Sequence, residues 1–131
     1  MYTFPSHYPP NCPPKPHDEM CGTYYRVVKN GNKSDTMHFK SHYEANLRVR
    51  LESTKACSRR ALSIFRIYEV AVNLSKQFPN IGEYIACLNL KGGHGVVREE
   101  SYRSFKSHHN WWVPNGVSAQ SFCSNIKGPV S

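Results

Sequence analysis

The sequence predicts a single α+β domain, in which one long amphipathic helix packs on a small, mostly antiparallel sheet behind a proline-rich arm. The chain has 131 residues, a length typical of one domain with one core. Hydrophobic residues make up 39% of it and aromatic residues 12%, which excludes a disordered chain. One segment has a helical apolar pattern, and short runs around it have strand patterns.

Residues 1–20 are predicted to form the arm, and residues 21–131 the domain. Six of the nine prolines lie in the first sixteen residues, where their fixed φ and missing N–H exclude helix and interior strand. We expect an extended path in which Tyr2, Phe4 and Tyr8 either anchor the arm on the domain or meet a partner. No stretch has the roughly 20 apolar residues of a membrane span, and the start lacks a secretory signal pattern.

The first strand is expected over residues 23–28, which are β-branched and aromatic. The Asn30-Gly31 pair that follows suits a tight turn with positive φ. Apolar positions in residues 35–52 fit neither the helical nor the strand period, so we expect loop mixed with short helix there.

The long helix is predicted over residues 59–78. Ser58 is its candidate N-cap, Pro79 ends it, and apolar residues recur through it on a wide face. The polar stripe opposite places three arginines on the exposed side of the first two turns, at positions 59, 60 and 66.

Shorter elements are expected after this helix. Residues 83–90 form an apolar run that suits a buried strand, and the glycine-rich segment 92–95 turns the chain. The segments after it are expected as a strand at 96–98 that pairs back, a loop at 99–106, and two short strands at 109–113 and 121–126.

The charge of the chain indicates a polyanionic partner. The net charge is +8. The segment from Arg26 to Arg66 contains ten basic residues and three acidic ones, a local excess of +7. Clustered Lys and Arg neutralise phosphates and release counterions, although a basic face can also serve solubility. The residues predicted to contact nucleic acid are Lys40, Arg48, Arg50, Arg59, Arg60, Arg66 and Trp111.

The five cysteines are an odd set without a C-x-x-C pair, which argues against a disulfide framework and favours a reducing, cytoplasmic location. Cys57 and Cys87 lie in apolar runs, where free cysteine packs as a small hydrophobe. Cys12 and Cys21 have two histidines nearby, but their spacing is not that of a zinc finger. We therefore expect no metal and no cofactor.

Two segments contain histidines that could carry chemistry. In residues 92–95 three glycines flank one imidazole, without a phosphate-loop signature, so a simple turn is the alternative. In residues 108–112 two histidines precede two tryptophans, which could bind a base, although neighbours in a strand face opposite sides. The candidate catalytic residues are His94, His108, His109 and Arg26, each weighed against a structural role.

Five segments of the chain resemble a group of small bacterial proteins. These segments are Tyr24–Val28, Phe39–Glu44, Leu62–Phe65, His94–Val96 and His108–Trp112. The resemblance covers about residues 12–122 and implies an intracellular, single-domain bacterial protein, without assigning any catalytic residue.

Remoter similarities point to enzymes. ADP-ribosyltransferases hold a dinucleotide with a first-strand arginine, a serine on a later strand and an acid. Arg26 and Ser41 could match the first two roles. The acid could be Glu44, Glu99, Glu100 or none of them, and the serine triplet of that family is absent. The spacing of Arg103 and His108 resembles one ribonuclease class, and residues 108–128 faintly resemble an HNH nuclease ending without its paired cysteines.

Three classes of function follow from these observations. The first is a small basic bacterial protein that binds nucleic acid, RNA or DNA, or a nucleoprotein complex. The second is a small toxin-type or defence enzyme acting on nucleotide or RNA with Arg26 and a histidine. The third is an accessory or inhibitor module that docks on an acidic protein and uses the arm.

Overall fold

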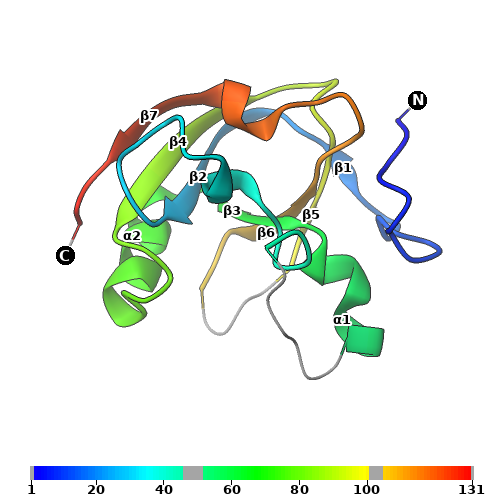
Figure 1. Ribbon diagram of the computed structural model, residues 1–131, viewed down its shortest axis with the longest axis horizontal. Coiled ribbons are helices and arrows are strands. Elements are labelled where there is room, and N and C mark those ends of the chain that lie inside the picture. The colour runs from blue at the N-terminus through cyan, green and yellow to red at the C-terminus, as the bar shows by residue number, and fades with distance from the viewer. Residues whose placement is uncertain (1, 46–51, 101–104, 131) are drawn as a thin grey trace.

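The computed structural model describes residues 2–45, 52–100 and 105–130 (Figure 1). Within these residues all strand pairs are antiparallel and form one sheet in the order β1-β5-β6-β3-β2-β4-β7. The strands are β1 (Asp18–Glu19), β2 (Gly22–Val28), β3 (Leu62–Phe65), β4 (Tyr84–Leu90), β5 (Val96–Glu99), β6 (His108–Trp112) and β7 (Cys123–Lys127). The helices are α1 (Glu52–Arg59) and α2 (Tyr68–Gln77), with 3₁₀ turns η1 (Thr36–Phe39) and η2 (Ala119–Phe122).

The α+β class with one long helix is wrong, because the fold is mostly β with two short α-helices. The segment 59–78 contains the end of α1, the strand β3 and then α2. In β3 the exposed Ser63 alternates with buried Leu62 and Ile64, which is a strand period that the dense apolar run concealed. The apolar positions that spread beyond one helical face belong to β3, whose Leu62 and Ile64 pack on one face of the sheet and whose Phe65 packs on the other.

The other strand predictions are close to the structure. β2 and β4 confirm the strands expected at 23–28 and 83–90, and β6 and β7 lie within two residues of the last two expected strands. β5 forms after the glycine turn as expected, but it pairs with β1 and β6 instead of β4. The mixed segment 35–52 contains η1 and the start of α1, and residues 46–51 and 101–104 lie outside the described residues.

Apolar side chains fill both faces of the sheet. One cluster draws on β2 to β7 and is centred on Leu62, Leu88 and Trp111. On the other face α2 buries Ala71 and Leu74 against Phe65 and Ile85. In Figure 1 both α-helices lie below the sheet, and a third cluster around Trp112 continues this face toward α1 and the arm.

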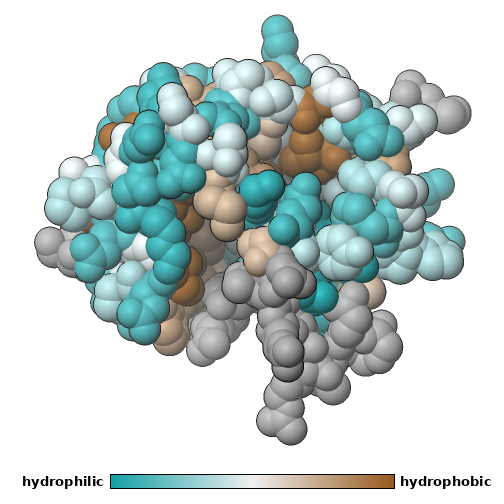
Figure 2. Space-filling model, in the orientation of Figure 1, coloured by the Kyte–Doolittle hydropathy of each residue, from teal (hydrophilic) through white to brown (hydrophobic). Residues whose placement is uncertain are grey.

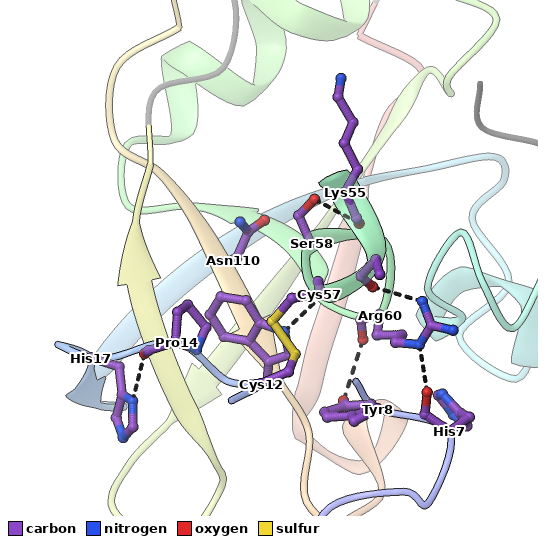
Figure 3. Close-up of a disulfide and its surroundings, with 12 residues drawn as sticks. His7, Tyr8, Cys12, Pro14, His17, Lys55, Cys57, Ser58, Arg60 and Asn110 are labelled. Carbon is purple, nitrogen blue, oxygen red and sulfur yellow. Dashed lines mark hydrogen bonds between the residues drawn. A yellow bond between two sulfur atoms is a disulfide. The ribbon is translucent and has the colours of Figure 1, made fainter. Parts of the chain in front are cut away.

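The arm packs on the domain through its aromatic side chains. Tyr2, Phe4 and Tyr8 lie against the cluster of Ala61, Val96 and Trp112. The Tyr8 hydroxyl donates to the carbonyl of Arg60, a contact visible in Figure 3. Anchoring on the domain is therefore the role these aromatic residues have in the structure.

A disulfide joins Cys12 of the arm to Cys57 of α1 (Figure 3), contrary to the expectation of free cysteines. The Cα atoms lie 5.6 Å apart although 45 residues separate them in sequence. The odd number of cysteines leaves Cys21, Cys87 and Cys123 as thiols. Counting cysteines missed this pair because only the folded-back arm brings the two together.

No helix in the part of the chain that the structure describes is long and apolar enough to cross a membrane.

Candidate functional site

Arginine side chains gather where the segment after η1 meets the end of α1. The backbone N–H of Tyr43 donates to the carbonyl of Arg59 at 3.1 Å, which holds the two segments together. The Arg60 guanidinium lies 3.9 Å from the centroid of the Tyr43 ring, and that of Arg59 lies 5.8 Å away. The His7 ring also stacks on Tyr43, with a centroid distance of 4.4 Å. An aromatic ring is thus surrounded by two guanidinium groups and an imidazole.

Arg60 is held in place by backbone carbonyls as well as by the Tyr43 ring. Its Nε donates to the carbonyl of His7 at 2.9 Å (Figure 3). Its Nη1 donates to the carbonyl of Ala56 at 2.7 Å. The guanidinium therefore ties the arm to α1.

Arg26 on β2 makes three backbone contacts. Its Nε donates to the carbonyl of His38 at 2.7 Å, its Nη1 to that of Ser63 at 3.0 Å and its Nη2 to that of Lys40 at 3.3 Å. Burial lowers the pKa of Arg26 to about 10, against the raising effect of Glu44, so the group stays charged at neutral pH. Arg26 therefore ties the segment after η1 to β3.

The positive charges act on two histidines. Burial lowers the pKa of His42, and the charges of Arg26 and Arg59 lower it further. Burial and the charge of Arg60 likewise lower the pKa of His7, against a smaller raising effect of Glu44. We call Arg26, His42, Arg59 and Arg60 the cationic cluster, because these contacts and charge effects place them together.

Ser41 and Glu44, the possible partners of Arg26 in the transferase comparison, do lie beside it but bind each other. The Ser41 N–H donates to Oε1 of Glu44 at 2.9 Å, and the Glu44 N–H donates to Oγ of Ser41 at 3.2 Å. This reciprocal arrangement resembles a helix capping box and is a structural use of both side chains. Ser41 is also buried, at 2% exposure.

The remaining residues predicted to contact nucleic acid are scattered. Arg60 precedes β3 and Arg66 follows it, so the length of this four-residue strand, about 13 Å, separates them. The Arg66 guanidinium stacks over the Tyr24 ring and donates to the carbonyl of Cys21. Trp111 is fully buried, and its Nε1 donates to the carbonyl of His94, so it offers no surface for a base. The side chain of Lys40 is half-buried. Arg48 and Arg50 lie outside the described residues.

His94 and His109 have structural environments. His94 lies in the turn between β4 and β5, where its Nδ1 accepts from the N–H of Lys91 and its ring stacks on Phe122 at 3.8 Å. His109 contacts the carbonyl of Ser107 through Nδ1, at 2.8 Å, and packs edge-on against Tyr24. His109 adjoins His108 in β6, and besides burial its charge contributes to lowering the pKa of His108.

His108 is buried on β6 and contacts a serine that the sequence did not single out. Its Nε2 lies 3.0 Å from Oγ of Ser63 on β3, and its Nδ1 lies 2.7 Å from the carbonyl of Glu100. Burial is the main cause of the lowered pKa of His108. Sequence alone could show that residue 63 was polar within an apolar run, but not which strand lay beside it.

Tyr43, His42 and His7 were also missed. They come from a loop and from the arm, and only tertiary contacts unite them with α1. No protein-family model, curated protein or solved structure matches the chain, so the geometry of these sites carries the functional argument.

Proposed function

We propose that this chain binds nucleic acid, RNA or DNA, or a complex containing it, through the cationic cluster. The observation that supports this proposal is the gathering of Arg26, Arg59 and Arg60 with His42 at one junction of the fold. Phosphate groups are the natural ligands of grouped guanidinium ions, which present several N–H donors in a planar fork.

The cluster is organised before any ligand arrives. Arg26 and Arg60 are fixed by backbone carbonyls, so their charges lose little side-chain entropy when an anion approaches. The side chains of His42, Arg59 and Arg60 are each partly accessible to solvent. A phosphate beside these groups would offset the repulsion among them.

The surface supports a polar ligand. In the view of Figure 2 hydrophilic side chains cover most of the described surface, and apolar surface is limited to separate patches. The net charge of +8 gives long-range attraction for any polyanion. The Cys12–Cys57 disulfide removes the argument for a reducing, cytoplasmic location that rested on unpaired cysteines.

The test is binding of fluorescently labelled single-stranded RNA and DNA, followed by anisotropy between about 0.05 and 0.5 M salt. We expect affinity to fall steeply with salt, and Arg59→Gln to weaken binding and reduce the salt slope by about one. Lys76→Gln is the matched control, because Lys76 is exposed on α2 and this substitution also removes one positive charge, at a place outside the cationic cluster.

A pH series separates the cluster from general charge attraction. Phosphate beside His42 raises its pKa, so binding takes up a proton and affinity should increase as pH falls through the usual histidine range. His42→Gln should remove this increase. Absent binding, salt-insensitive binding, or equal losses in Arg59→Gln and Lys76→Gln would each contradict the proposal.

A further inference from the structure

Ser63 and His108 form a hydrogen-bonded pair across neighbouring strands. Ser63 lies in β3 with an exposed side chain, and His108 lies in β6 with 5% exposure. The 3.0 Å contact between Oγ and Nε2 is within the range needed for proton transfer. A hydroxyl at the surface backed by a buried imidazole is the arrangement of an activated nucleophile.

The contacts of His108 fix which ring nitrogen carries the proton. A carbonyl oxygen can only accept, so Nδ1 donates to the carbonyl of Glu100 at 2.7 Å. In the neutral ring this leaves Nε2 unprotonated and able to accept the hydroxyl proton of Ser63. Burial favours this neutral form at pH 7, because it lowers the pKa of His108.

Glu100, the residue that orients the imidazole, is itself held by two further contacts. Its N–H donates to the carbonyl of His108 at 3.0 Å. Its Oε2 accepts from Nδ2 of Asn110 at 2.8 Å, and Asn110 lies directly opposite Ser63 in the β3–β6 register. These contacts keep the His108 ring in position during proton transfer. In hydrolase triads a third residue orients the histidine in the same way.

We propose that Ser63 is a nucleophile activated by His108, and that the pair cleaves carboxylic esters. The Ser63 oxygen forms a bond to the acyl carbon while its proton moves to Nε2 of His108. The ester C–O bond breaks, and the alcohol leaves with that proton. Water then repeats the sequence on the acyl-serine, which releases the carboxylic acid and restores Ser63.

A contact from β2 holds the backbone of Ser63. The Arg26 guanidinium donates to the carbonyl of Ser63 itself, at 3.0 Å. This contact holds the main chain of Ser63 in place while its hydroxyl contacts His108. The inference does not depend on nucleic-acid binding, and its experiment contains no nucleic acid.

The experiment exposes the full chain to a fluorophosphonate probe, in which serine oxygen bonds to phosphorus and fluoride leaves, followed by peptide mass spectrometry. We expect modification at Ser63, none at that peptide in Ser63→Ala, and at least about tenfold slower modification in His108→Gln. Ser124→Ala is the control, because Ser124 is another exposed strand serine, whose hydroxyl donates to the carbonyl of Cys87. p-Nitrophenyl acetate should give a burst of nitrophenol that disappears in Ser63→Ala.

Circular dichroism shows whether His108→Gln folds. If it does not, the pH dependence of the modification rate in the unaltered chain still tests the proposal. In the unaltered chain the modification rate should rise with pH and level off below about pH 6.5, because the pKa of His108 is lowered. Failure to modify Ser63, equal modification of Ser124, or a rate that ignores pH in this range would overturn the proposal.

Discussion

At the scale of single residues, Arg26 shows that a candidate functional side chain can also have a structural role. The sequence offered it as a phosphate ligand or catalytic residue, and an arginine within an apolar strand is a reasonable candidate. Its guanidinium contributes charge to the cationic cluster and also donates to three backbone carbonyls on η1, on the segment after it and on β3. The sequence could not reveal this, because the acceptors are main-chain atoms that belong to distant residues.

We predict that Arg26→Lys destabilises the fold by about 2–4 kcal/mol, because an ammonium group cannot reach three carbonyls and leaves buried acceptors without donors. Urea denaturation measures the change in the free energy of unfolding. The same substitution at the exposed Arg66 should cost under about 1 kcal/mol. Equal costs at the two positions would contradict the structural role of Arg26.

At the scale of elements, local patterns predicted the strands that carry clear signals. Residues 23–28 are β-branched and aromatic before a turn, and β2 lies there. The helix predicted over residues 59–78 was wrong because Leu62, Ile64 and Phe65 adjoin the apolar residues of α2 and together with them fit a helical period. β3 has a single polar residue, Ser63, within a short apolar run, and such a run is not distinguished from a helical segment by its period.

The arm gives a prediction at the same scale. The Cys12–Cys57 disulfide closes a loop with a sequence separation of 45 residues, which stabilises the fold by about 4 kcal/mol in the chain-entropy description. The double variant Cys12→Ser, Cys57→Ser should lose about this free energy of unfolding. Alkylation in denaturant should modify three cysteines without reductant and five with it. Five modified cysteines without reductant would contradict the pairing.

At the scale of the whole molecule, the charge balance was readable from the sequence, but its placement was not. The excess between Arg26 and Arg66 predicted one basic helical face. The structure separates Arg66 from Arg59 and Arg60 by the length of β3 and adds His42 to them. Similarly, His108 was a candidate from its sequence, whereas its partner Ser63 required knowledge of the sheet order.

We predict that the chain becomes less stable as pH falls below about 6.5. Burial lowers the pKa of His7, His42 and His108 in the folded state, so the unfolded chain binds more protons between the lowered values and 6.5. The stabilisation is complete above this window and is lost as pH falls through it. Melting temperatures between pH 8 and pH 5 measure the effect, and His108→Gln should flatten the curve. A melting temperature that does not decrease would contradict these shifts.

The sheet itself is divided by its weakest ladder. β2 and β3 share one residue pair, Tyr25 with Phe65, whereas β2 and β4 share seven. The strands β1-β5-β6-β3 and β2-β4-β7 are therefore two half-sheets with little main-chain bonding between them. Cooperative unfolding of these halves depends on side chains that span the boundary, and these include the core cluster of Leu62, Leu88 and Trp111, the apolar face of α2 and the guanidinium of Arg26. A single guanidinium thus helps to make two half-sheets behave as one thermodynamic unit.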